Sequence, residues 1–159
     1  MSRAPSVDRV RQALRDAGLA NEILELAETT RSAAEAAAAI GCDVAQIAKS
    51  VVIRGGGGRA VLVVASGVNR IDEAKLAALL GERILKADAG FVRERTGFAI
   101  GGVPPVAHVT PPHVFLDDDL FAFERVYAAA GSPFAVFALT PGELARLTGG
   151  RRADIRKNA

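Results

Sequence analysis

The chain is organised around one stretch, Thr96-Gly97-Phe98-Ala99-Ile100-Gly101-Gly102-Val103-Pro104-Pro105-Val106-Ala107-His108. Its apolar run over residues 98–100 predicts a buried strand that ends at two glycines, and two prolines follow one residue later. Glycine permits positive φ and a close approach of ligands, whereas proline fixes φ and removes an N–H. We therefore expect a stiff loop that presents the N–H groups of Gly101, Gly102 and Val103 to a carbonyl that becomes an oxyanion, or to a phosphate. A plain tight turn between strands is the alternative.

Length and composition predict a single globular domain over residues 1–159. Half of the 159 residues are apolar, which provides an ample core, and no apolar run is long enough to cross a bilayer. The N-terminus lacks a secretory pattern and Cys42 is the single cysteine, so we expect a cytoplasmic protein without a disulfide. A net charge of +2 and a pI near 9.0 permit contact with nucleic acid without requiring it.

Neither a metal nor a cofactor is expected. His108 and His113 lie five residues apart in a proline-rich segment, with no second cysteine and no HExxH pattern, so zinc ligands are absent from the pattern. The acidic run 117–119 is interpreted as a solvated turn and helix cap because EF-hand spacing is missing. The glycines at 55–58 join two β-branched runs and lack the Gly-Lys-Ser/Thr ending of a phosphate loop, so they predict a hairpin turn.

The periodicity of the remaining chain predicts alternating helices and strands. Helices are expected between residues 6 and 18, 32 and 41, 72 and 80, 88 and 95, and 140 and 149. Strands are expected over residues 21–27, 50–54, 60–65, 84–85, 98–100, 114–116, 124–130, 135–139 and 151–157. Because hairpins mix with helical crossovers, we expect an α/β fold of the α+β type, with a mixed, mainly antiparallel sheet surrounded by helices.

Four segments of the sequence resemble the YbaK/EbsC family, which includes the editing domain inserted in bacterial prolyl-tRNA synthetases. They are residues 43–52 (DVAQIAKSVV), 66–72 (SGVNRID), 96–105 (TGFAIGGVPP) and 130–133 (AGSP). Each motif is weak alone, but the four follow one another in family order and at family-like intervals. The resemblance extends from about Thr29 to the final strand, and it implies the fold of that editing domain.

The resemblance implies hydrolysis of mischarged aminoacyl-tRNA by a free-standing protein that acts in trans. In the family, the lysine matching Lys49 places a cation near the 3′-terminal adenosine, and the loop matching residues 101–105 places backbone groups near the ester. A lysine at a strand entrance is otherwise a solvated edge charge. If the amides of the loop stabilise the oxyanion and a positioned water attacks the ester, the reaction needs no nucleophilic side chain of the protein. The expected partner is the 3′ acceptor end of an aminoacyl-tRNA, with an aminoacyl-tRNA synthetase as a second candidate.

Further residues are assigned to substrate binding through the same resemblance. They are Thr29, Thr30, Ser66, Asn69, Arg70, Pro104 and Gly131. The two threonines precede the alanine-rich helix that borders the pocket in the family, and helix capping is their alternative role. The three residues of the 66–72 segment shape a turn or contact ribose or phosphate. The glycine at 131 lies either across the pocket or in an ordinary hairpin turn.

One departure from the family pattern bears on the substrate. Some bacterial members carry an acidic residue in the strand after the glycine matching Gly131, whereas this chain has Ala135 and Val136 there. An apolar lining favours a small side chain such as that of alanine or cysteine, carried on tRNA-Pro. Two other functions remain open from the sequence: a module that binds aminoacyl-tRNA or a synthetase without cleaving it, and a small-molecule esterase or nucleotide-binding protein.

Overall fold

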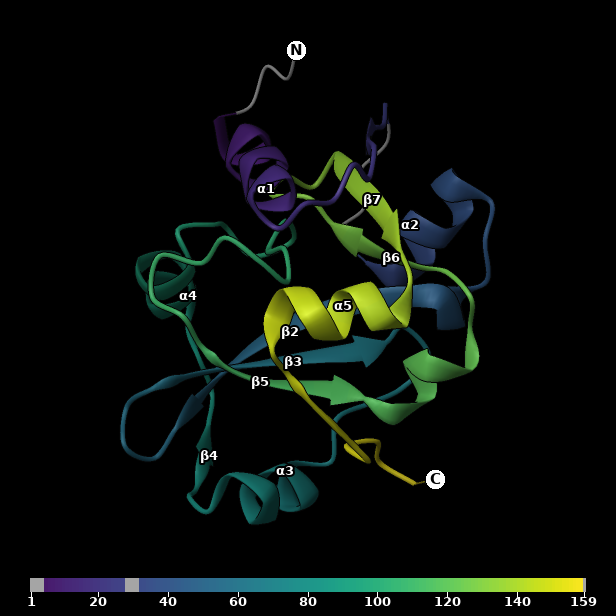
Figure 1. The fold of residues 1–159 in the computed structure, drawn as a ribbon. Helices are drawn as coiled ribbons and strands as arrows, with labels where there is room; N and C mark the ends of the chain where they lie inside the picture. The colour runs from purple at the N-terminus through teal and green to yellow at the C-terminus, as the bar shows by residue number, and fades with distance from the viewer. Residues whose placement is uncertain (1–4, 28–31, 159) are drawn as a thin grey trace.

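The computed structural model describes residues 5–27 and 32–158, and Figure 1 shows how their helices surround a twisted sheet. The helices are α1 (Pro5–Asp16), α2 (Ala33–Ile40), α3 (Glu73–Leu80), α4 (Ala89–Thr96) and α5 (Pro141–Thr148), with 3₁₀ turns η1 (Val44–Gln46) and η2 (Asp118–Ala122). The strands are β1 (Ile23–Glu25), β2 (Ile47–Gly55), β3 (Ala60–Ser66), β4 (Ile84–Leu85), β5 (His113–Asp117), β6 (Val126–Ala129), β7 (Ala135–Leu139) and β8 (Arg151–Ala153).

The strands form one mixed sheet in the order β1-β7-β6-β2-β3-β5-β8, and β4 pairs with β2 beside this path. Among the described residues, β1–β7, β2–β3, β2–β4 and β6–β7 pair antiparallel, whereas β2–β6, β3–β5 and β5–β8 pair parallel. Antiparallel pairings therefore outnumber parallel ones. The structure confirms the predicted α/β fold with a mixed, mainly antiparallel sheet surrounded by helices.

The core lies on both faces of β3, which is buried at every position. Side chains alternate along a strand, so Leu62 and Val64 face one side while Val61 and Val63 face the other. The first pair packs in a cluster with residues of α1 and α5, and the second packs with Leu76 and its neighbours on α3. None of the helices within residues 5–27 and 32–158 is long and apolar enough to cross a membrane.

One edge of β2 changes partners along its length, and this opens the sheet. Ile47 and Ala48 pair with β6, whereas Arg54 and Gly55 pair with β4. Between these two contacts, residues 49–53 pair with β3 alone among the strands that the structure describes. The sheet therefore splits along this part of β2, and Lys49 lies inside the strand rather than at its entrance.

The predicted strand over residues 98–100 is wrong. α4 ends at Thr96, and the chain then makes a turn in which the Gly102 N–H donates to the Ala99 carbonyl at 3.1 Å. Phe98 is 1% exposed and belongs to the core, whereas Ile100 is 60% exposed. One buried aromatic residue therefore anchors this run, and no strand within residues 5–27 and 32–158 pairs with it.

Candidate active site

The open edge of β2 forms one wall of a cavity of about 590 Å³. The other walls come from α2, from β6 and β7, and from the loop that follows α4. Among the lining residues are Lys49, Ser50 and Val52 of β2, Gly67 after β3, and Ile100, Gly101 and Val103 of the loop. Lys49 and the loop thus share one cavity, although about fifty residues separate them in the sequence.

Lys49 is half-buried in this cavity, and its Nζ donates to the carbonyl oxygen of Asn69 at 3.2 Å. Burial lowers the pKa of the Lys49 ammonium, the charge of Asp117 raises it, and the charge of Arg70 lowers it. An ammonium has three donors, so the contact with Asn69 leaves two for a ligand. A partly desolvated cation with free donors is suited to holding a phosphate or carboxylate.

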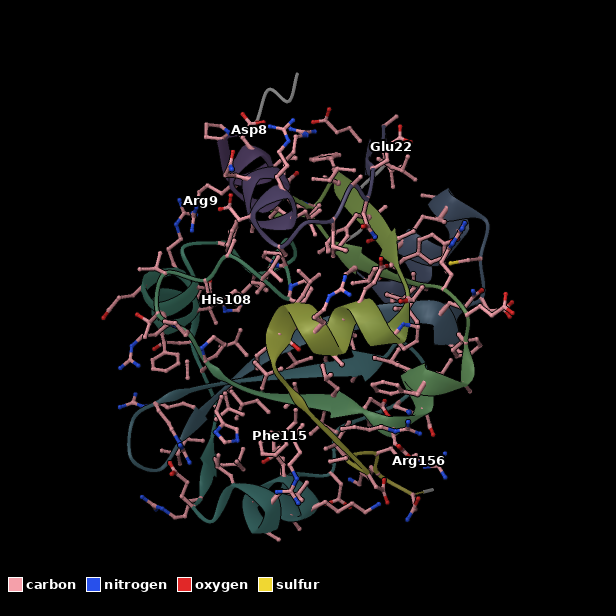
Figure 2. All side chains as sticks on the ribbon, in the orientation of Figure 1. Asp8, Arg9, Glu22, His108, Phe115 and Arg156 are labelled. Carbon is pink, nitrogen blue, oxygen red and sulfur yellow. The ribbon has the colours of Figure 1, made fainter. Side chains whose placement is uncertain are left out.

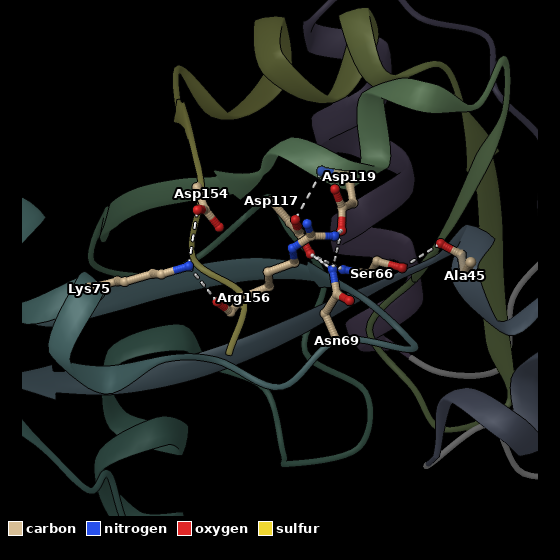
Figure 3. A network of polar contacts seen from close by, with 8 residues as sticks. All are labelled: Ala45, Ser66, Asn69, Lys75, Asp117, Asp119, Asp154 and Arg156. Atoms are coloured by element: carbon tan, nitrogen blue, oxygen red, sulfur yellow. Dashed lines mark hydrogen bonds and ion pairs between the residues drawn. The ribbon is translucent and has the colours of Figure 1, made fainter. Parts of the chain in front are cut away.

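A polar network fixes the position of Asn69 (Figure 3). Its side-chain amide donates to Asp117 Oδ2 at 2.9 Å and to Asp119 Oδ2 at 2.8 Å. Asp119 in turn forms an ion pair with Arg156 at 2.9 Å, and Asp117 accepts the N–H of Ser66 at 2.9 Å. These contacts hold the turn after β3, and through the Asn69 carbonyl they hold the Lys49 ammonium.

Asp117 corrects the prediction that the acidic run 117–119 is a solvated turn. It is 1% exposed, although it does cap η2 as predicted. Its carboxylate accepts three hydrogen bonds, the third from the N–H of Asp119 at 3.0 Å. A buried carboxylate is tolerated when donors of this kind satisfy it. The apolar strand residues that precede Asp117 were the sequence signal for its burial.

The loop after α4 offers fewer amides to the cavity than the sequence predicts. Gly101 has a φ of 97° and lines the cavity together with Val103. Gly102 does not serve as a donor there, because its N–H is bonded to Ala99. A Cβ at Gly102 would lie 2.8 Å from the backbone of Ser132, so the glycine is needed for the close contact between two loops. In the described part of the chain, the N–H groups of Gly101 and Val103 have no acceptor.

Comparisons with known proteins identify the family of this chain. The family model of the aminoacyl-tRNA editing domain matches residues 27–147. The chain belongs to this family. This confirms the resemblance to YbaK/EbsC proteins, and the residues around Lys49 and the loop after α4 lie within the matched part of the editing domain.

Three relatives resemble this chain over most of their length. A chain described as "Crystal structure of a putative trans-editing enzyme for prolyl tRNA synthetase" is 47% identical, with a TM-score of 0.93, covering 99% of this chain and 100% of that one. The hypothetical protein APE2540 is 32% identical, with a TM-score of 0.88, covering 94% and 99%. Uncharacterized protein YwhH of Bacillus subtilis (strain 168) is 35% identical over 128 residues, which are 80% of this chain and 82% of that protein.

Of the other residues assigned to substrate binding, those that the structure describes do not line the cavity. The Ser66 hydroxyl donates to the Ala45 carbonyl at 2.7 Å, and both N–H groups of the Asn69 amide are engaged as described above, which favours the turn interpretation for both residues. Arg70 is exposed and affects Lys49 through its charge. Thr29 and Thr30 lie outside the described residues.

Pro104 and Gly131 lie away from the cavity lining. The Pro104 carbonyl is 2.7 Å from His108 Nε2, and the proline is buried. Gly131 lies in the hairpin turn between β6 and β7 with a φ of 96°, and a Cβ there would lie 2.6 Å from the Ser6 carbonyl oxygen. Neither residue lines the cavity. The hairpin alternative for Gly131 is therefore the one that the structure favours.

The cavity wall also contains residues that sequence analysis missed. Ser50 follows Lys49, and its Oγ is buried without a partner in the described residues. Tyr127 pairs in register with Ile47 and lines the cavity beside Val136. The alternation along β2 gave no signal for Ser50, because it places Lys49 and Ser50 on opposite faces of that strand, and the cavity is lined by residues of both faces.

The lining of the editing-domain cavity is otherwise small and apolar. Alanines from α2, β2, β6 and the segment before α4 contribute much of it: Ala33, Ala34, Ala36, Ala48, Ala87, Ala128 and Ala129. The lining residues that the structure describes include no carboxylate, and no group of acidic, histidine or cysteine side chains that could hold a metal is found in the described chain. Such a wall suits a small neutral side chain better than a charged one.

Proposed function

We propose that this protein is a trans-acting aminoacyl-tRNA deacylase, which hydrolyses the ester of a mischarged tRNA. The observation that supports the proposal is that Lys49, Gly101 and Val103 line a single cavity. In the reaction, a water oxygen adds to the ester carbonyl carbon and the carbonyl oxygen becomes an oxyanion. The bond from that carbon to the ribose oxygen then breaks, and the products are the free amino acid and a tRNA with a free hydroxyl.

The residues at the cavity divide this work between them. Lys49 anchors a phosphate at the 3′ end of the tRNA, and the N–H groups of Gly101 and Val103 donate to the oxyanion. Loss of one oxyanion donor typically lowers kcat by about 10²–10³-fold, so backbone amides alone can supply much of the catalysis. The hydroxyl next to the ester on the terminal ribose positions the water, so the protein needs no nucleophile.

We further propose that the mischarged amino acid is small, with alanine or cysteine on tRNA-Pro as the specific candidates. The alanine-rich lining and the apolar Val136 support a small neutral side chain. The 47% identity to a chain whose name refers to prolyl tRNA synthetase supports tRNA-Pro, and an aminoacyl-tRNA synthetase is a candidate partner. The 3′ acceptor end is the part of the tRNA that enters the cavity.

A panel of charged tRNAs tests the proposal. The purified protein is mixed with tRNA-Pro carrying alanine, cysteine or proline and with tRNAs that carry bulky or charged amino acids, and loss of the ester is followed over time. We expect fast hydrolysis of the small misacylated substrates and nearly complete loss of hydrolysis in Lys49→Ala, with Lys157→Ala as the control. Binding without turnover would instead indicate a non-catalytic module. Equal competition by free aminoacyl esters or nucleotides would indicate a small-molecule enzyme.

A further inference from the structure

The loop that carries Gly101 and Val103 is fastened at both ends by one side chain of α1. Arg9 Nη1 donates to the carbonyl of Gly97 at 3.0 Å, and Arg9 Nη2 donates to the carbonyl of Ala107 at 3.1 Å. In Figure 2, the Arg9 side chain extends from α1 toward the loop that follows α4. The two carbonyls belong to residues ten positions apart, so the guanidinium closes the loop.

The same guanidinium also packs on the loop. Its central carbon lies 4.3 Å from the centre of the Phe98 ring, and that ring is 1% exposed. A planar guanidinium can stack on an aromatic face and donate in two directions from one rigid fork, which an ammonium cannot do. The contact therefore fixes the direction of the chain at Phe98, three residues before Gly101.

Backbone strain at Ala107 indicates that this contact holds the loop in a conformation that it would not adopt freely. Ala107 has a φ of 67°, in the left-handed region that alanine rarely occupies. Such strain persists only where surrounding contacts determine it. Two contacts hold the backbone around Ala107: the hydrogen bond from Arg9 to the Ala107 carbonyl, and the hydrogen bond from the Val109 N–H to the Thr96 carbonyl at 3.1 Å.

We propose that Arg9 is a positioning residue for deacylation, which keeps the amides of Gly101 and Val103 at the cavity by fastening both ends of their loop to α1. This inference rests on the proposed function. α1 lies outside residues 27–147, which the editing-domain model matches. A displacement of about 1 Å in a reacting group can cost about 10²-fold in rate, which sets the scale of the effect.

The position of Arg9 separates this role from general stability. Arg9 is exposed, and α1 is anchored to the core by Val7, Val10 and Leu14, which are each at most 1% exposed. Arg11 provides a matched control on the same helix, because its guanidinium pairs with Asp8 at 2.7 Å and not with the loop. Both residues carry the same charge, so each alanine substitution removes one positive charge from the helix.

The kinetic test compares Arg9→Ala, Arg9→Lys and Arg11→Ala on the charged tRNA that the wild type hydrolyses fastest. We expect kcat of Arg9→Ala to fall about ten- to a hundred-fold with KM within about twofold of the wild type. Arg9→Lys recovers little of kcat, since an ammonium cannot span both carbonyls, and it serves as the test should Arg9→Ala not fold. Arg11→Ala retains the wild-type constants. A wild-type kcat in Arg9→Ala, a change in KM alone, or an equal loss in Arg11→Ala would overturn the inference.

Amide hydrogen exchange without RNA provides a measurement that does not depend on activity. We expect the hydrogen-bonded N–H groups of Phe98 and Gly102 in this loop to exchange at least about tenfold faster in Arg9→Ala than in the wild type or Arg11→Ala, with the sheet unchanged. A wild type that hydrolyses no charged tRNA would overturn the proposed function and the catalytic role of Arg9, while exchange would still decide whether the fastening exists. If the wild type does hydrolyse charged tRNA but exchange in Arg9→Ala is the same as in the wild type, the inference about Arg9 is overturned while the proposed function stands.

Discussion

The Lys49 ammonium is held by the carbonyl oxygen of Asn69, at 3.2 Å, and not by a carboxylate at ion-pair distance in the described chain. A carboxylate partner would neutralise the cation and occupy its donors. Instead, the carboxylates of Asp117 and Asp119 accept hydrogen bonds from the Asn69 side chain. They therefore contact Lys49 only indirectly, through Asn69. The charge at the cavity is thereby positioned and still available to a ligand.

Lys49→Met should separate activity from stability. Methionine keeps the length of the side chain but removes the ammonium, whose partial burial disfavours the charged state, as its lowered pKa indicates. We expect deacylation to be nearly abolished and Tm to rise above that of the wild type. Thermal unfolding by circular dichroism, together with the ester assay, measures both. A fall in Tm would mean that the bond to Asn69 outweighs the cost of burial.

The pH dependence of catalysis should report the Lys49 ammonium. Burial is the largest influence on this group and brings its pKa below the ordinary value of 10.5. The ammonium is charged below its pKa, so the enzymatic rate, divided by the spontaneous rate of ester hydrolysis, should fall as pH rises through this lowered pKa. The measurement is kcat/KM, which reports the free enzyme.

Lys49→Arg is the control for the pH profile, because a guanidinium stays charged across the whole range. Whatever activity this variant retains should show no such fall with rising pH.

The folding stability of the wild type should depend on pH in the opposite direction to its activity. The unfolded chain binds more protons between the lowered and the ordinary pKa, so stability of the wild type should rise with pH across that window. Denaturant unfolding of the wild type and Lys49→Met at two pH values tests this second expectation.

Asp117→Asn should weaken the fold and the site together. Oδ2 of Asp117 accepts from Ser66 and from Asn69, and Oδ1 accepts from Asp119, so an amide would turn an N–H₂ group toward at least one donor. A buried donor left without a partner costs about 1–3 kcal/mol. Urea unfolding should show a loss of this size, and deacylation should fall because the Asn69 carbonyl shifts.

Asp118→Asn is the matched control for that substitution. Asp118 lies next to Asp117 but is exposed, and it pairs with the exposed Arg152. An exposed ion pair contributes about 0–1 kcal/mol, so the control should change stability and activity little. An equal loss of stability in both variants would contradict the role assigned to the buried carboxylate.

Local chemistry in the sequence was sufficient to predict most of the elements. The capping boxes Ser32 with Glu35 and Thr140 with Glu143 are both formed, so α2 and α5 begin where the sequence indicates. The glycines after these two helices adopt the left-handed conformation that ends a helix. These signals act over three to five residues, and no distant part of the chain competes with them.

The features that the sequence did not predict depend on distant contacts. Phe98 is buried by α1 and the core and not by strand pairing, so its apolar run was mistaken for a strand. The burial of Asp117 depends on donors 48 and 51 residues away. Arg9 contacts carbonyls 88 and 98 residues away, and no periodicity within α1 distinguishes it from the other basic residues of that helix. Positioning of the loop is thus a tertiary property.

Gly101→Ala should impair catalysis more than its cost in stability explains. Gly101 has a φ of 97°, and an alanine there is strained by about 1–2 kcal/mol or turns its peptide groups to relieve the strain. Either response moves the amides that line the cavity. Gly58→Ala is the matched control, because Gly58 has a φ of 91° in the turn between β2 and β3 and a Cβ there meets no atom within 4 Å. Both variants should lose similar stability in urea unfolding, while kcat should fall about tenfold or more in Gly101→Ala alone. Equal kcat values in the two variants would show that the conformation of the loop does not matter for hydrolysis.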